Sequence, residues 1–216
     1  MFLIHGYNNE PREVARAYQV IEEKTASHLG HYDIVVGYTW PGGDDGTDYF
    51  AAKSRAGAVS RRARPMVEFL MNNAAELGIM CHSMGARISL LFLNDMRNQG
   101  VHKTIDMRLY VMAAAVDNEA LERGERYHSG SQFCDNTYVF HSRKDPVLRR
   151  IYRLAEWDRA LGHSGPESPA DTEIQVKVIN CKKKICKHGA YKRTDDIYHY
   201  IQSEMTGPPS PRFVTL

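Results

Sequence analysis

The most informative stretch of the chain is residues 79–85, which read Ile-Met-Cys-His-Ser-Met-Gly. A short apolar run leads into Ser83, and an amphipathic pattern follows from Met84 to about Arg97. Ser83 therefore stands between a predicted strand and a predicted helix, with the small residue Gly85 just after it. This pattern is typical of a sharp strand-to-helix turn that exposes one hydroxyl. We interpret Ser83 as a candidate nucleophile.

Size and composition are those of a globular protein with one well-buried core. The chain has 216 residues, of which 43% are hydrophobic and 25% are charged. A net charge of +2 gives no field that favours nucleic acid. No apolar run is long enough to span a bilayer, so we expect no membrane partner.

The N-terminus and the cysteines indicate a cytoplasmic protein. The opening Met1–Ile4 has neither the basic segment nor the cleavage site of a signal peptide. The four cysteines form no zinc-type C-x-x-C pair. We favour free thiols in a reducing cytoplasm over the alternative of a disulfide between Cys181 and Cys186.

Short apolar runs alternate with longer helical patterns along the chain, which predicts βαβ units and a parallel sheet. Strands are expected at residues 1–5, 32–38, 77–81, 106–114, 137–141 and 173–180. Helices are expected from 11 to about 30, at 50–73 (as one helix or as two broken near Pro65), and at 84–97, 147–159 and 195–205. Residues 117–135 are expected to form a loop or a short helical excursion. The sequence thus predicts a single domain over residues 1–206 and a proline-rich C-terminal tail at 207–216.

Four polar residues lie at or shortly after the ends of predicted strands: His5, Ser83, Asp145 and His188. Ligands of parallel sheets bind at the carboxyl ends of the strands, so we expect these residues to gather at one edge. A serine nucleophile needs a base, and the base needs a carboxylate that holds its tautomer. We therefore predict a catalytic triad in which Ser83 is the nucleophile, Asp145 the acid and His188 the base.

Other residues compete for two of these roles. Asp117 follows the preceding predicted strand and is either the acid or a helix cap. Among the alternative bases, His199 falls inside the closing helix and His163 comes too early. His82 neighbours the serine, but we expect its side chain to point away from the turn.

Together these features resemble the α/β-hydrolase superfamily, particularly its small bacterial esterase-like members with a His-Gly-Tyr-Asn-Asn loop. The resemblance runs from Phe2-Leu3-Ile4-His5-Gly6-Tyr7-Asn8-Asn9 to Cys186-Lys187-His188-Gly189. One departure is that Cys81 replaces the first glycine of the elbow, and we expect the turn to form with slight adjustment. The resemblance implies a three-layer sandwich with a mostly parallel sheet of about six strands, lacking the first two strands of the full fold.

The resemblance also implies an oxyanion hole made by two backbone N–H groups, those of Met84 and Tyr7. Such donors are worth several kcal/mol in the transition state. We expect His5 to brace the loop and Gly6 to permit its close approach. Asn8–Asn9 would add side-chain donors or make turns.

No cofactor is indicated by the sequence. Zinc-protease and phosphate-binding motifs are both missing, and residues 44–48 resemble a calcium loop only in composition. Trp40, Tyr49 and Phe50 either line a substrate pocket or pack beneath long loops, and the two interpretations have equal weight.

The resemblance favours hydrolysis of small or medium soluble carboxylic esters through an acyl-serine, because no large apolar insertion exists to form a lipase lid. Acyl transfer or thioester cleavage by the same triad is one alternative. A non-catalytic binding module is another, motivated by the missing elbow glycine. The sequence gives no indication of the oligomeric state.

Overall fold

A computed structural model describes residues 1–7, 9–43 and 49–216. Seven strands form one sheet in the order β2-β1-β3-β4-β5-β6-β7. Every neighbouring pair is parallel, so all the strands end at the same edge. The strands are β1 (Phe2–Ile4), β2 (Val36–Tyr38), β3 (Glu76–His82), β4 (Asp106–Met112), β5 (Asn136–His141), β6 (Val176–Asn180) and β7 (Phe213–Thr215).

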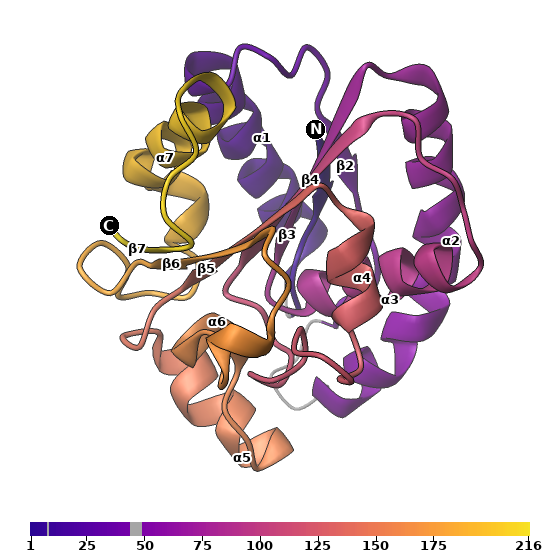
Figure 1. The fold of residues 1–216 in the computed structure, drawn as a ribbon. Helices are drawn as coiled ribbons and strands as arrows, with labels where there is room; N and C mark the ends of the chain where they lie inside the picture. Colours follow the sequence, from indigo (N-terminus) through magenta and orange to yellow (C-terminus); the bar gives the residue numbers. More distant parts are fainter. Residues whose placement is uncertain (8, 44–48) are drawn as a thin grey trace.

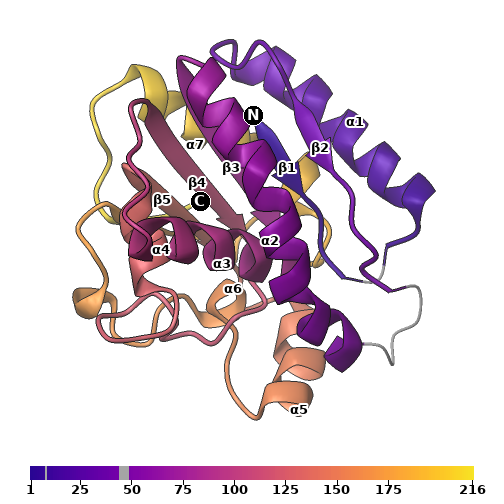
Figure 2. The same cartoon turned by 90° about the vertical axis from the view of Figure 1, so that its right-hand side faces the viewer.

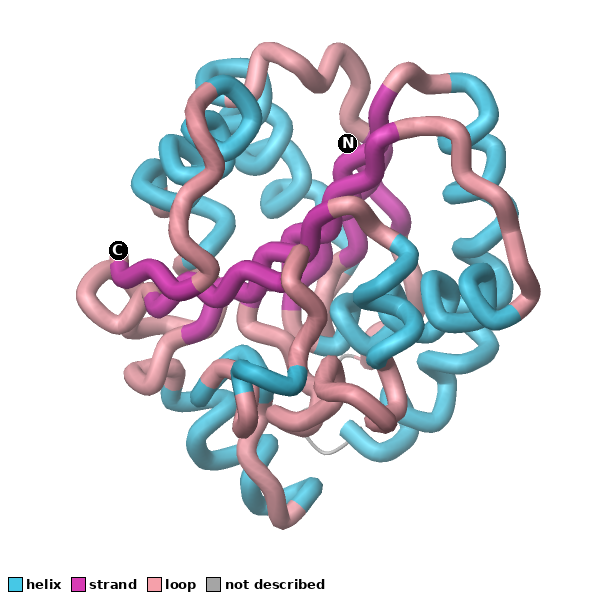
Figure 3. The backbone as a smooth tube through the Cα atoms, in the orientation of Figure 1, coloured by secondary structure: helices cyan, strands magenta, loops and turns pink. Residues whose placement is uncertain are grey.

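Helices cover both faces of this sheet, which makes the three-layer α/β sandwich expected from the sequence (Figures 1 and 2). One face carries α1 (Pro11–His28) and α7 (Asp195–Thr206). The other carries α2 (Tyr49–Asn73), α3 (Met84–Asn98) and α4 (His128–Phe133). Figure 3 shows the strands running through the middle of the molecule between the two sets of helices. The short α5 (Arg153–Glu156) and α6 (Leu161–Ser164) follow β5.

The sequence explains the central elements directly. Five consecutive residues of β3, from Leu77 to Cys81, are buried, as expected for a strand covered on both faces. Helix α1 begins at Pro11, where a proline costs no hydrogen bond, and a capping box joins Glu10 and Glu13. Its buried residues recur at helical spacing and face the sheet.

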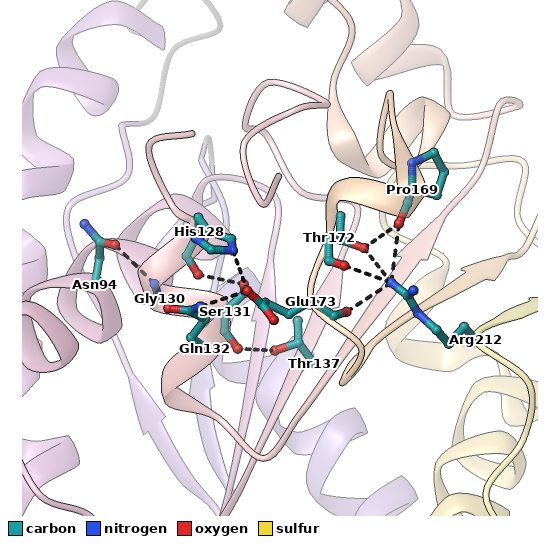
Figure 4. Close-up of polar contacts among 10 residues, drawn as sticks. All are labelled: Asn94, His128, Gly130, Ser131, Gln132, Thr137, Pro169, Thr172, Glu173 and Arg212. Carbon is teal, nitrogen blue, oxygen red and sulfur yellow. Dashed lines mark hydrogen bonds and ion pairs between the residues drawn. The ribbon is translucent and has the colours of Figure 1, made fainter. Parts of the chain in front are cut away.

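The sheet has seven strands where the sequence predicted about six, because β7 lies within the predicted tail. Val178 pairs with Phe213 in parallel register. The preceding Arg212 donates hydrogen bonds to the backbone oxygens of Pro169, Thr172 and Glu173 (Figure 4). These contacts come from distant residues, so a local pattern does not reveal the strand.

Residues 117–135, predicted as a loop or short helical excursion, are tied down by polar contacts shown in Figure 4. The carboxylate of Glu173 accepts hydrogen bonds from His128 Nε2 and Gln132 Nε2, both at 2.8 Å. The N–H of Gly130 donates to Asn94 Oδ1 of α3 at 3.1 Å. Helix α4 is thereby held between α3 and the segment that enters β6.

None of the helices in the described ranges has the length and apolar character needed to cross a membrane. All four cysteines are free thiols; Cys186 is exposed, and the other three are buried.

Candidate active site

Ser83 occupies a strained turn between β3 and α3. Its backbone has φ 55° and ψ −119°, a conformation that L-residues rarely adopt and that is typical of functional sites. The turn forms with Cys81 in place of the usual glycine; its buried thiol lies 3.5 Å from the Tyr110 carbonyl. Burial raises the pKa of Cys81 to about 12, so this thiol stays protonated.

Two glycines permit the close packing around this turn. A Cβ on Gly85 would lie 2.5 Å from the Ile4 oxygen and 2.6 Å from the His5 oxygen. A Cβ on Gly6 would lie 2.9 Å from the Cβ of Ser83. The first turn of α3 and the loop after β1 therefore pack directly against each other, and larger residues would force them apart.

The structure brings His188 and Asp145 together. The His188 Nδ1–H donates to Asp145 Oδ2 at 2.8 Å, and the carboxyl group is fully buried. The other oxygen, Oδ1, accepts the N–H groups of Val147 at 3.0 Å and Leu148 at 3.2 Å. Burial alone would raise the pKa of Asp145, but the hydrogen bonds from His188 and the backbone outweigh it and hold the pKa below its usual value.

The alternative acid and bases have other contacts. Asp117 accepts a hydrogen bond from Tyr152 Oη at 2.6 Å. His199 packs edge-on against His28, with ring centroids 4.6 Å apart. His163 offers its backbone oxygen to the ring of His141 at 3.4 Å. Of the candidates weighed from the sequence, the structure pairs only Asp145 with His188.

Ser83 and His188 line one cavity of about 320 Å³. In the described part of the chain the Ser83 hydroxyl makes no hydrogen bond to the imidazole. Catalytic hydrogen bonds are often long in the absence of substrate and tighten when it binds. Both side chains therefore face the same space, where a substrate can bridge them.

The position of His82 differs from the expectation that it points away from the turn. Its Nε2 lies 2.8 Å from the backbone oxygen of His188, and the two rings are 4.6 Å apart. Burial, together with the neighbouring His188, lowers the pKa of His82 to about 3, so the ring is neutral and Nε2–H donates. His82 thus anchors the loop that carries His188.

Of the two expected oxyanion donors, Tyr7 lines this cavity and Met84 directly follows Ser83 in the chain. Met84 is the first residue of α3, and the N–H groups of a first helical turn have no acceptor within the helix. Tyr7 lines the cavity together with Ser83, and its ring packs edge-on against Tyr49 at 5.9 Å. Asn9 Nδ2 donates to the Tyr7 oxygen at 2.8 Å and shapes the loop. Asn8 lies outside the described residues.

His5 and Trp40 brace the same loop. The Trp40 N–H donates to His5 Nε2 at 3.1 Å, the indole N–H donates to the His5 oxygen at 3.0 Å, and the rings stack at 5.4 Å. Since Nε2 accepts, the His5 Nδ1–H donates to the Gly6 oxygen at 2.8 Å. Of the three aromatic residues expected at the substrate pocket, Tyr49 lines the Ser83 cavity, Trp40 lines a neighbouring hollow, and Phe50 lines neither. The Phe50 side chain is instead 60% exposed.

No metal centre is found among the residues that the structure describes. No group of three or more His, Cys, Asp or Glu side chains there could hold an ion. The acidic stretch at 44–48, which resembles a calcium loop in composition, lies outside the described residues.

The parallel sheet and its strained strand-to-helix turn place the protein in the α/β-hydrolase superfamily. Residues 1–196 match the family described as "Alpha/beta hydrolase of unknown function (DUF900)", and the chain belongs to this family. The crystal structure of the lin2722 gene product from Listeria innocua is similar, with a TM-score of 0.57 and 9% sequence identity. That similarity covers 100% of this chain and 97% of the other, and it shows a shared fold. A comparison with curated proteins found no match.

Proposed function

We propose that this hydrolase cleaves small or medium carboxylic esters through an acyl-serine intermediate. The observation that carries the proposal is the 2.8 Å hydrogen bond between His188 Nδ1 and the buried Asp145. An ionised carboxylate fixes the tautomer in which Nδ1 carries the proton, so Nε2 is free to act as a base. The strained turn presents Ser83 to the same cavity as this imidazole.

The reaction would proceed in two halves. Ser83 Oγ attacks the ester carbonyl while His188 Nε2 takes its proton, and the protonated imidazole then gives that proton to the departing alkoxide. Water attacks the acyl-serine, losing a proton to His188, and the acid leaves as Ser83 regains its proton. The N–H groups of Met84 and Tyr7 would stabilise the oxyanion in both halves.

The geometry of the serine turn favours a working site over the alternative of an inactive binding module. That alternative rested on the replacement of the elbow glycine by Cys81, yet the serine turn forms with this residue in place. Competing alcohols or thiols in the assay would reveal acyl transfer, because new esters or thioesters would then accompany the free acid.

Replacement of the nucleophile tests the proposal. We expect Ser83→Ala to abolish turnover of p-nitrophenyl acetate while circular dichroism and melting temperature show a folded protein. Ser60→Ala is a matched control, because it removes another buried serine hydroxyl, one without a hydrogen-bond partner in the described structure. Full turnover in the Ser83→Ala protein would refute the proposal.

A further inference from the structure

The cavity at Ser83 continues away from the strand ends, between α1 and the sheet. One wall consists of Leu3 in β1 and Met80 in β3. The opposite wall consists of Val14, Ala17 and Ile21, which share the buried face of α1. All five side chains are buried and apolar. An apolar space therefore extends from the serine under the first helix.

Polar contacts hold α1 in place on the sheet, so the space does not close by collapse of the helix. The Tyr18 hydroxyl accepts the N–H of His5 at 3.0 Å and donates to the Tyr38 oxygen at 2.6 Å. This residue follows Ala17 directly, and the small alanine leaves room beside it. Because apolar voids cost stability unless filled, a space preserved in this way next to a nucleophile indicates a ligand.

Given the proposed esterase function, on which this inference rests, we propose that the cavity binds the acyl chain of the substrate. An unbranched, saturated chain of medium length fits, because the walls beneath α1 are apolar and the whole cavity, at about 320 Å³, is at the small end of ligand cavities. Lys192 also lines the cavity, and the methylenes of a lysine side chain can cover apolar surface. Ala17 then sets the chain length.

Chain length should control the rate in a measurable way. A buried methylene contributes about 0.8 kcal/mol, which corresponds to about a fourfold rise in kcat/KM for each carbon. The rise ends when the cavity is full. We therefore expect kcat/KM, measured for saturated p-nitrophenyl esters from acetate to dodecanoate, to have its maximum at medium chain length.

Two substitutions on α1 test this assignment against a matched control. Ala17→Phe fills the cavity, so we expect it to move the maximum to shorter chains. Ile21→Ala enlarges the cavity and moves the maximum to longer chains. Ala15→Phe makes the same change as Ala17→Phe on the exposed face of α1 and leaves the profile as in wild type. Identical profiles for folded Ala17→Phe and Ala15→Phe proteins would overturn the assignment.

Equilibrium binding separates this inference from the esterase proposal. Calorimetric titration of saturated fatty acids into Ser83→Ala protein needs no turnover. We expect decanoate to bind more weakly to the protein with both Ser83→Ala and Ala17→Phe than to the Ser83→Ala protein. Its affinity for the protein with both Ser83→Ala and Ala15→Phe should equal that for Ser83→Ala. If no ester is turned over but this difference persists, the esterase proposal fails and the chain-binding cavity stands. If esters are turned over and the difference is missing, the cavity assignment fails alone.

Discussion

At the scale of single residues, the site combines a strained serine with tightly packed neighbours. Ser83 keeps a backbone conformation that costs of order 1–3 kcal/mol, and such residues persist only where their surroundings over-determine them. Gly85 and Gly6 supply that constraint, since neither leaves space for a Cβ against the opposing loop. The turn is thus fixed before any substrate binds.

Asp145→Asn should nearly abolish the proposed reaction. The buried carboxylate accepts all its hydrogen bonds, and an amide in its place favours the wrong tautomer of His188. We expect kcat to fall by roughly 10⁴-fold with a small change in KM, as in triads of this type. Steady-state kinetics on a short ester measures both constants.

The control for this variant is Asp117→Asn, which changes the alternative acid. Its carboxylate contacts Tyr152, so we expect kcat to remain within a few-fold of wild type. A large loss of activity in Asp117→Asn, with Asp145→Asn close to wild type, would reverse the assignment of the acid.

The role of His82 shows where residue-level prediction from sequence stops. Its neighbour Ser83 was identified from a local pattern of a strand, a small residue and a helix. The contact between His82 and His188 joins segments 106 positions apart and depends on the conformation of the loop after β6. No pattern near residue 82 carries that information.

At the scale of elements, the strongly patterned segments were predicted well. Helix α1 was expected to start at Pro11, and α3 at Met84, and both do. Pro65 was expected either to break α2 or to lie within it, and the helix continues through it. β2 is shorter than predicted, since only residues 36–38 pair with β1. β7 was missed because a three-residue strand has too little pattern.

The Arg212 side chain should therefore determine whether β7 stays paired. Arg212→Met keeps much of the side-chain length but removes the hydrogen bonds to residues 169–173. We expect a loss of about 1–3 kcal/mol of unfolding free energy. Amide exchange should quicken at Val178 and Leu216, whose N–H groups bond across the β6–β7 pair. Unchanged exchange at both amides would show that β7 is held by strand pairing alone.

At the scale of the whole molecule, the buried His5 and His141, the half-buried His82 and the buried Asp145 share a direction of pKa change. Burial lowers the pKa of His5, of His82 to about 3 and of His141 to about 4. Asp145 also has a lowered pKa, where its hydrogen bonds overcome the opposing effect of burial. For each group the unfolded chain binds protons more readily than the folded one.

Stability should consequently fall in mild acid. The histidines contribute stability that is fully present above their unfolded pKa of about 6.5 and is lost as the pH falls toward their folded values. Below about pH 4 the stability contributed by the Asp145 carboxylate is lost as well. We expect the melting temperature to drop steadily as the pH falls from about 6.5 to about 4, and His141→Asn to reduce the slope. A flat melting temperature over this range would contradict the expected change.

The architecture as a whole followed from the alternation of strands and helices, because parallel sheets with helical crossovers allow few topologies. The meeting of His188 with Asp145 was also predictable, since both follow strands that end at one edge. The cavity under α1 was not, because Val14, Ala17 and Ile21 have the same pattern as an ordinary packed helix face. Whether such a face leaves a void depends on side chains from distant strands.

Covalent labelling with a fluorophosphonate probe tests whether Ser83 is an activated nucleophile, because the reagent reacts only with a hydroxyl activated by a base. We predict that folded protein is labelled once, that peptide mapping places the adduct on Ser83, and that His188→Gln prevents the reaction. Folded protein that stays unlabelled, or carries the adduct on another residue, would contradict the account.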